Sequence, residues 1–388
     1  MALELADIFR EYGAAYRQKY ASKMLPSHRQ AMHAIEQCRT QALGGQLYSC
    51  STCGEVGYSY HSCRNRHCPK CQYEQAQEWL HLQERLLLQV PYFLLTFTIP
   101  AELRILASRN QKLFYTTLFR ASAEATQELA RNPRFIGGQI GLVGVLHTWT
   151  RNLAYHPHVH YPVPFVDFSC EERDYLVPGG GLSSNQSWLR ARNNFFLPVR
   201  ALSRLFRARF QQLLSKTSIF PLIPADVWYR DWVVHCKGVG NGQTALQYLA
   251  PYVYRVAISN RRLIKMVNTG KMESSQITFQ YRASDTAQLK LCTLSAEKFI
   301  HRFLQHVLPR GFVKVRYFGF FGASVRPRLL ALQQRLEHIP PIESAKPLPG
   351  IDSDQIPSDD SHPTWLCPKC GKPMLFQRAL APSPCRSP

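Results

Sequence analysis

The sequence predicts an α+β protein in which a helical, cysteine-rich segment precedes a larger region of strands and helices. Residues 46–71 are rich in cysteine and poor in core residues. Apolar, strand-like runs follow at 91–100 and 137–165, and long helical patterns cover 101–131 and 195–215. Because strands and helices do not alternate regularly, a barrel of parallel strands is disfavoured.

Size and composition predict a globular chain of two or three domains with at least one large core. The chain has 388 residues, of which 45% are hydrophobic and 19% charged. No stretch approaches the roughly 18–20 apolar residues that cross a bilayer. The first twenty residues carry acids and an amphipathic pattern, unlike a signal peptide. We expect a cytoplasmic protein with no membrane partner.

The charge balance predicts a nucleic-acid partner. The chain has 47 Lys and Arg against 26 Asp and Glu, a formal net charge of +21. Such an excess favours binding to phosphates, because neutralising them releases condensed counterions. A merely basic protein, or one with a membrane or ribosome role, is a weaker interpretation.

The predicted elements follow from hydrophobic spacing. Helical spacing covers 1–45, ended by Gly44-Gly45, and resumes over 72–90. The later elements in chain order are a buried strand at 91–100, a long helix at 101–131, two adjacent strands within 137–165, a basic amphipathic helix at 195–215, a strand at 232–237 and a mostly helical segment at 243–258.

Composition divides the chain into four parts. Residues 1–88 form a helical, cysteine-rich domain, and residues 89–335 form a larger domain of strands and helices. Residues 336–363 are rich in Pro, Ser and Asp with little to bury, which predicts a disordered linker. Residues 364–388 form a short tail with one CxxC pair.

Twelve cysteines in a chain without an export signal indicate metal binding, not disulfides. Two CxxC pairs, Cys50/Cys53 and Cys68/Cys71, are separated by fourteen residues. This spacing is typical of two knuckles that close one tetrahedral four-thiolate site. We therefore predict one structural zinc ion bound by these four residues.

Other residues near the zinc motif leave alternatives open. Four lie close enough to replace a ligand or to build a second site: Cys38, His61, Cys63 and His67. The basic residues Arg64, Arg66 and Lys70 suggest that the module also touches DNA. The C-terminal Cys367/Cys370 pair has no obvious second pair, and His362 and Cys385 are weak candidates.

The run YHPHVHYPVPF predicts a second kind of metal site. On a strand, His158 and His160 point to the same side and can bind one divalent ion. Two imidazoles and one further ligand would leave positions open for phosphate oxygens. The third ligand is open between His147, His156 and Gln247.

Two tyrosines complete the predicted chemistry. Tyr248 and Tyr252 lie four residues apart, so a helix would place both phenols on one face, and Tyr254 off it. A phenol has a pKa near 10 and needs a metal-polarised phosphate or a base to attack. A metal site beside such a tyrosine predicts a centre that nicks and joins DNA.

The combined motifs resemble the rolling-circle insertion-sequence transposases of the HUH type, named for His–hydrophobic–His, with two tyrosines and an N-terminal zinc-binding domain. The resemblance covers nearly the whole chain and rests on these segments: SCRNRHCPKCQ (62–72), YFLLTFTIP (92–100), VLHTWTRNLAYHPHVH (145–160), FFLPVRALSRLFR (195–207), YLAPYVYRVAISNRRL (248–263) and HRFLQHVLPRGFVKVRYFGF (301–320).

The resemblance implies an antiparallel sheet flanked by helices, with the histidines on a central strand that faces the tyrosine helix. The family's metal ligands correspond to His158 and His160, which would hold Mg²⁺ or Mn²⁺, and its nucleophiles to Tyr248 and Tyr252. It further implies cleavage of single-stranded or hairpin element ends through a 5′-phosphotyrosine, then transfer to target DNA. Two departures stand out: Pro251 lies between the tyrosines, and RYFG (316–319) replaces a histidine-containing version.

The resemblance leaves rival functions to test. A rolling-circle replication initiator or a relaxase shares the histidines and tyrosines, whereas the zinc block favours a transposase. A zinc-dependent DNA-binding protein without catalysis would bind without forming a covalent adduct. No nucleotide cofactor is expected, because the strand transfer nearly conserves bond energy and no Walker-type glycine loop is present.

Overall fold

The computed structural model describes most of the chain. The described residues are 3–71, 81–82, 84–85, 88, 91–159, 175–178, 180–183, 188–190, 195–241, 257–283, 286, 288–325, 331, 333–334 and 365–383. Several predictions therefore lie outside the described residues: His160, Gln247, Tyr248, Tyr252 and the linker at 336–363. The helix predicted at 72–90 is described at only five positions.

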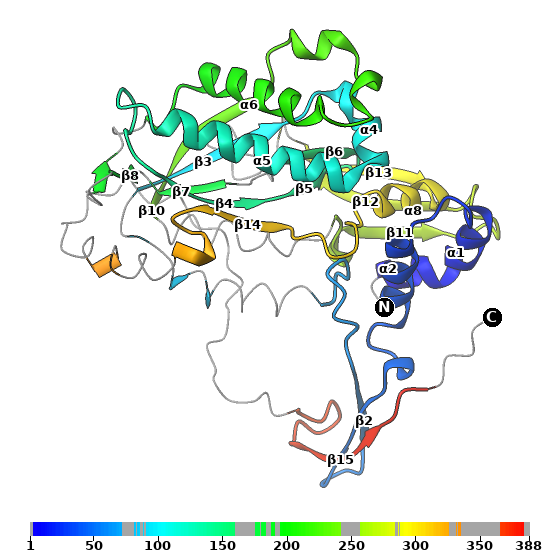
Figure 1. Cartoon of the computed structure of the whole chain (residues 1–388). Helices are drawn as coiled ribbons and strands as arrows, with labels where there is room; N and C mark the ends of the chain where they lie inside the picture. The colour runs from blue at the N-terminus through cyan, green and yellow to red at the C-terminus, as the bar shows by residue number, and fades with distance from the viewer. Residues whose placement is uncertain are drawn as a thin grey trace.

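An antiparallel sheet forms the centre of the molecule (Figure 1). Followed from each strand to its paired neighbour, the strands are β14 (Val315–Gly319), β4 (Gly141–Val145), β7 (Tyr175–Pro178), β3 (Pro91–Thr98), β6 (Tyr155–Val159) and β5 (His147–Trp149), with β10 (Val234–Asn241) also paired to β3. The buried strand predicted at 91–100 is thus confirmed, and the strand predicted at 232–237 begins and ends slightly later.

The register shows that these seven strands occupy five rows. Strands β4 and β5 follow one another along one row, and β6 and β7 share the next, because both lie between that row and β3. Strand β10 pairs with the other edge of β3, and β14 with the outer edge of β4. The row of β6 is therefore central, and every pairing within the sheet is antiparallel.

Helices cover one face of this sheet. Helix α5 (Gln111–Ala130) and helix α6 (Val199–Leu214) lie side by side over it (Figure 1). The predicted amphipathic pattern explains α6, which buries Leu202, Phe206, Phe210 and Leu214 at helical spacing. Phe206 packs against Phe97 of β3 with ring centroids 4.9 Å apart. The main hydrophobic core lies between these helices and the sheet.

The prediction of one long helix at 101–131 is wrong in one respect, because the structure divides this segment into separate helices. A short 3-10 turn η2 (Ala101–Leu103) leads into α4 (Arg104–Arg109), and α5 begins only after Asn110. Asn110 leaves the helical region at φ −128° and ψ 44°, and its side-chain amide donates to the Leu106 carbonyl. A short polar side chain that bonds to the backbone competes with helix continuation.

A second core joins the N-terminal helices to a smaller sheet. It packs α1 (Leu5–Lys19), α2 (Pro26–Gln37) and α8 (Ala296–Leu304) with β11 (Leu263–Val267), β12 (Gln276–Arg282) and β13 (Leu289–Ser295). The Phe9 ring of α1 meets the Phe303 ring of α8 edge to face at 5.4 Å. The N-terminal helical region is therefore part of the body of the protein.

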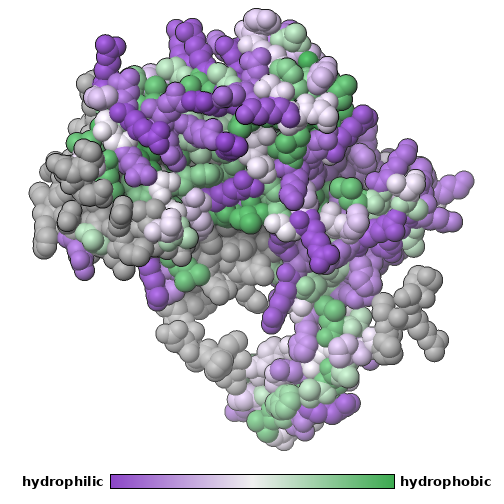
Figure 2. All heavy atoms as spheres, viewed as in Figure 1, coloured by the Kyte–Doolittle hydropathy of each residue, from purple (hydrophilic) through white to green (hydrophobic). Residues whose placement is uncertain are grey.

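A third unit, here termed the terminal ribbon, comprises residues 45–60 and 365–383. Its sheet has the order β15 (Met374–Leu380), β1 (Gly45–Cys50), β2 (Val56–Tyr60), so the C-terminal segment pairs with the N-terminal one. The terminal ribbon projects away from the main sheet (Figure 1), and Figure 2 shows hydrophobic residues gathered at its far end. Leu375 and Phe376 are among its exposed apolar side chains.

The remaining short elements are β8 (Gly180–Leu182), β9 (Trp188–Arg190), η1 (Gln41–Leu43), η3 (Phe220–Leu222), η4 (Ala225–Trp228), η5 (Asn260–Arg262) and η6 (Ala323–Val325). Helices and antiparallel sheets are thus combined as the sequence predicts. Among the described residues, no helix combines the length and apolar character needed to span a membrane.

Candidate functional site

His158 lies in the central row of the main sheet. Strand β6 pairs on both edges there, with His158 opposite Thr98 of β3 and opposite His147 of β5. Both histidine side chains are buried. Because Phe93, Leu95 and Phe97 of β3 point to the helices, Thr96 and Thr98 share the opposite face. The histidines therefore lie on the sheet face that α5 and α6 do not cover.

The ring orientation of His158 suits a metal ligand. Its Nδ1 is in hydrogen-bond contact with the backbone oxygen of His156, and a carbonyl oxygen can only accept. A neutral imidazole in this arrangement carries its proton on Nδ1 and its lone pair on Nε2. Such a bond from the other ring nitrogen is the usual way that a protein fixes a ligating histidine.

Of the two third-ligand candidates that the structure describes, His147 and His156, the better placed is His147. Its ring centroid lies 6.1 Å from that of His158. With metal–nitrogen bonds of about 2.1 Å, two imidazoles on one ion have ring centroids about 5.3 Å apart at a tetrahedral angle and about 6.5 Å apart when collinear, so the observed separation requires a wide angle between these two ligands. The His156 ring is 4.9 Å from the His158 ring, but its Nδ1 accepts from the Arg104 guanidinium at 2.9 Å.

His306, which no sequence motif marks, supports the hairpin that carries His147 and His158. It follows α8, is buried, and stacks on Tyr155 with ring centroids 6.2 Å apart. Its Nδ1 meets the Thr148 hydroxyl at 3.2 Å and its Nε2 the Leu153 carbonyl at 3.3 Å. Burial lowers the pKa of His306 to about 4, so the ring is neutral at physiological pH.

The tyrosine segment, here residues 242–256 with Tyr248 and Tyr252, lies outside the described residues, and described residues flank it on both sides. The last residue before it is Asn241, the end of β10, and the first described residues after it are Ala257 and Ile258, buried in the second core. Just beyond them, the Arg262 guanidinium donates to the Arg151 carbonyl in the β5–β6 turn. The described residues that follow this segment are therefore attached, through Arg262, to the hairpin that carries His158.

The cysteines gather into two groups of four, each with all sulfur atoms within 4.8 Å of one another. The first group, here termed the inner cluster, consists of Cys38, Cys63, Cys68 and Cys71. The Cys38 and Cys71 sulfurs are 3.5 Å apart, and those of Cys63 and Cys71 are 3.7 Å apart. A tetrahedral zinc site with Zn–S bonds of about 2.3 Å requires sulfurs about 3.8 Å apart.

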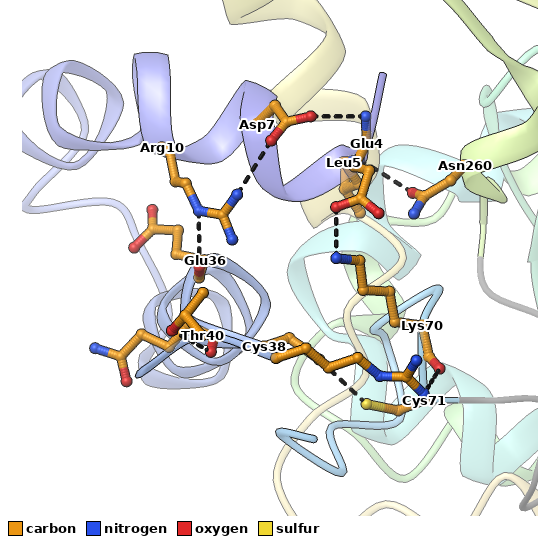
Figure 3. Close-up of polar contacts among 12 residues, drawn as sticks. Glu4, Leu5, Asp7, Arg10, Glu36, Cys38, Thr40, Lys70, Cys71 and Asn260 are labelled. Carbon is orange, nitrogen blue, oxygen red and sulfur yellow. Dashed lines mark hydrogen bonds and ion pairs between the residues drawn. The ribbon is translucent and has the colours of Figure 1, made fainter. Parts of the chain in front are cut away.

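The inner cluster lies against the start of α1 (Figure 3). Lys70 forms an ion pair with Glu4 at 2.5 Å. The backbone N–H of Leu5, the residue after Glu4, donates to the Asn260 side chain at 3.1 Å. Asn260 follows the tyrosine segment. Arg66 donates to the carbonyls of Pro309 and Phe312. Because Arg66 and Lys70 make these internal contacts, the predicted DNA contact of this loop has weaker support.

The second group, here termed the outer cluster, consists of Cys50, Cys53, Cys367 and Cys370. Its sulfur pairs lie at 3.4 Å, from Cys50 to Cys370, and at 3.5 Å, from Cys53 to Cys367. It lies where β1 ends and just before β15 begins. Both groups fit the geometry of a structural zinc ion.

The prediction of one site built from Cys50, Cys53, Cys68 and Cys71 is therefore wrong in its grouping. The structure places the first pair in the outer cluster and the second in the inner cluster. The reason is topological: strand β2 carries the chain from the outer cluster back to the body, so neighbouring pairs are separated. Cys38 and Cys63 complete the inner cluster, as the second-site alternative allowed. His67 instead accepts from the Leu308 backbone N–H.

A repeated motif could have shown the correct pairing. Only the first pair and the C-terminal pair continue as CxxCG, with Gly54 and Gly371 at φ +71° and +69°. In both CxxCG segments the backbone N–H of the first cysteine donates to the carbonyl of the residue five positions later. The backbone N–H of the glycine donates to the carbonyl of that first cysteine. Equal backbone geometry marks the two halves of one site.

Hydrogen bonds within the two clusters divide the thiols into some that favour the thiolate form, which binds metal, and others that favour the thiol. The pKa is raised at Cys53, Cys63, Cys68 and Cys370. Backbone N–H groups of Cys53 and Thr52 lower the pKa of Cys50 to about 6. Hydrogen bonds from Cys63 and Cys68 lower the pKa of Cys38 to about 7. Hydrogen bonds from Cys38 and its neighbours also lower the pKa of Cys71.

Comparison with known proteins finds two families whose models match the chain. A family model described as "Putative transposase" (Y2_Tnp) matches residues 141–328, and one described as "Transposase zinc-binding domain" (Zn_Tnp_IS91) matches residues 8–99. The "Putative transposase y4qJ" of Sinorhizobium fredii (strain NBRC 101917 / NGR234) is 40% identical over 351 residues, covering 84% of this chain and 82% of the relative.

A second relative is the transposase for insertion sequence element IS801 of Pseudomonas savastanoi pv. phaseolicola. It is 28% identical over 308 residues, covering 74% of this chain and 68% of the relative. No solved structure matches the chain.

The mixed fold, the cysteine clusters and these matches define a DNA transposase with an N-terminal zinc-binding domain. The chain belongs to the rolling-circle family of IS91-type insertion-sequence transposases.

Proposed function

We propose that this transposase nicks and rejoins single-stranded or hairpin element ends by tyrosine attack, within an HUH-type site formed by His158, His160, Tyr248 and Tyr252. The observation that carries the proposal is the position of His158: buried, in the central row, with its Nδ1 bonded to a carbonyl. The attachment of Arg262 to the β5–β6 turn supports the placement of the tyrosine segment near it.

Each step of the proposed reaction balances. The Tyr248 phenol oxygen attacks the phosphorus, a tyrosine–phosphate bond forms, and the bond from phosphorus to the 3′ oxygen breaks. The phenol proton ends on that 3′ oxygen, leaving a free 3′-hydroxyl and a 5′-phosphotyrosine. Attack by the 3′-hydroxyl of another strand reverses these changes and releases the tyrosine. One bond replaces another at each step, so no nucleotide is consumed.

The histidines would hold the ion that assists this chemistry. His158 and His160, with His147 as the third ligand, fit Mn²⁺ or Mg²⁺ with positions left for phosphate oxygens. When bound, the ion would stabilise negative charge that develops on the phosphate. The protein itself fixes the His158 tautomer and keeps the site on a rigid sheet.

Cleavage of a labelled single-stranded oligonucleotide that carries an element end tests the proposal. The Tyr248→Phe/Tyr252→Phe double variant should lose cleavage, whereas Tyr254→Phe, the matched change off the shared helical face, should retain it. Equal cleavage by the double variant and the parent would refute tyrosine attack. Binding without cleavage by the parent, at saturating Mg²⁺ and Mn²⁺, would instead favour a DNA-binding role alone.

A further inference from the structure

We infer that the C-terminal CxxC pair and the first N-terminal CxxC pair bind one zinc ion, which fastens the two ends of the chain into the terminal ribbon. This inference does not depend on the proposed cleavage chemistry. The zinc-binding family match ends at residue 99 and the transposase match at residue 328, so neither includes Cys367 or Cys370. The pair is separated from Cys53 by more than 300 residues of chain.

The first support is the geometry of the outer cluster. Four sulfurs lie within 4.8 Å of one another, with two pairs at 3.4 and 3.5 Å. The two contributing knuckles have the same backbone hydrogen bonds and the same left-handed glycine. At these distances, four thiolates around one ion satisfy a tetrahedral zinc site, as closed structural sites require.

The second support is the small apolar core of the terminal ribbon. Its buried hydrophobic residues are Cys50, Cys367 and Met374, with Tyr48 and Cys53 partly buried against them. Strand β15 presents Leu375 and Phe376 to solvent. A unit this small cannot bury enough apolar surface to fold by packing alone, so a metal ion must supply much of its stability.

The third support is the strand pairing that the ion would close. Strand β15 pairs with β1 from Gly45–Leu380 to Cys50–Met374, and the register brings the two knuckles to the same end. The Gly371 knuckle turns the chain back toward β15, and Met374 N–H donates to the Trp365 carbonyl at 2.7 Å. The C-terminus is thereby held to the zinc-binding domain and forms no separate tail.

Zinc content of the full-length protein tests the shared site. Atomic emission after exchange into chelator-treated buffer should give two zinc ions per chain for the parent. Cys50→Ser/Cys53→Ser and Cys367→Ser/Cys370→Ser should each lose one, and the quadruple variant should lose that same one and no more. Cys292→Ser, outside both clusters, is the matched control and should keep two. If Cys367→Ser/Cys370→Ser kept both ions, or the quadruple variant lost more than each pair, the shared site would be excluded.

A second measurement covers variants that fail to fold. A protease recognition sequence inserted after Gly350 of the otherwise unchanged chain allows the two ends to be cut apart. We expect the C-terminal fragment to co-elute with the rest of the protein in zinc-containing buffer. It should separate when a chelator removes the ions. Separation in the presence of zinc, or retention after both ions are removed, would overturn the inference.

Discussion

At the scale of single residues, the two predicted nucleophiles should differ. Pro251 lies between them, and a proline inside a helix removes one hydrogen bond and clashes with the carbonyl four residues earlier, here Gln247. The expected kink would move Tyr252 relative to the histidines and leave Tyr248 aligned. We expect Tyr248→Phe to abolish first-strand cleavage, and Tyr252→Phe to impair transposition while some nicking remains. Equal loss of nicking in both variants, or loss only with Tyr252→Phe, would reverse this assignment.

His306 should make stability depend on pH. Its pKa is about 4 in the folded protein and near 6.5 when unfolded, so the unfolded chain binds the extra proton first. The stabilisation is fully present above pH 6.5 and is lost as the pH falls toward 4. When the pH is lowered from 7.5 to 5.5, protonation of His306 in the unfolded chain should lower the free energy of unfolding by about 1.4 kcal/mol.

Urea unfolding of the parent and of His306→Gln measures this contribution. The glutamine can still bond to Thr148 or Leu153 but does not titrate. We expect the variant to be less stable at pH 7.5 and to lose less stability on going to pH 5.5. An unchanged pH dependence would show that His306 is not held neutral.

At the scale of elements, the edge strand β14 depends on Gly319. This residue has φ +60°, and a Cβ built on it would lie 1.7 Å from the Ile140 carbonyl oxygen. Gly311 has a similar φ of +72°, but a Cβ there would meet nothing within 4 Å. Both alanine variants bear left-handed strain of about 1–2 kcal/mol, and only Gly319→Ala adds a clash with backbone.

Denaturant midpoints of the two glycine variants separate strain from the clash. Gly319→Ala should be less stable than Gly311→Ala by at least about 2 kcal/mol, because β14 must move away from β4. Similar stabilities for the two variants would mean that the edge row adjusts freely.

The spacing of apolar residues in the sequence correctly predicted those helices and strands that pack one apolar face against the main core. Helix α6 follows from Leu202, Phe206 and Phe210 on one face, and β3 from an unbroken apolar run. The break at Asn110 escaped prediction, because one asparagine within a strong helical pattern is usually tolerated, whereas here its side chain bonds to the Leu106 carbonyl. The support of the β5–β6 hairpin by His306 also escaped, since it joins residues about 150 positions apart.

At the scale of the whole molecule, the zinc ligands show what local spacing cannot determine. Each of the predicted cysteines Cys50, Cys53, Cys68 and Cys71 lies in a four-sulfur cluster, yet their grouping depends on a strand from the far end of the chain. The catalytic assignment of His160, Tyr248 and Tyr252 still rests on the sequence, because these residues lie outside the described part of the structure.

The net charge of +21 should govern DNA affinity. The helical face of the molecule is largely hydrophilic in Figure 2. Each phosphate neutralised on a single strand contributes a slope of about −0.7 to the plot of log affinity against log salt. Fluorescence anisotropy of a labelled oligonucleotide should therefore show affinity falling steeply between low and physiological salt. An affinity independent of salt would contradict an electrostatic DNA interface.

The most direct test of the proposed chemistry is to trap the covalent intermediate. The protein is incubated with a single-stranded element end and divalent ions, denatured, digested and analysed by mass spectrometry. We predict a peptide in which Tyr248 carries the 5′-phosphate of the cleaved DNA, formed only when His158 is intact. A cleaved product without any adduct, an adduct on another residue type, or a 3′-phosphate linkage would contradict the mechanism.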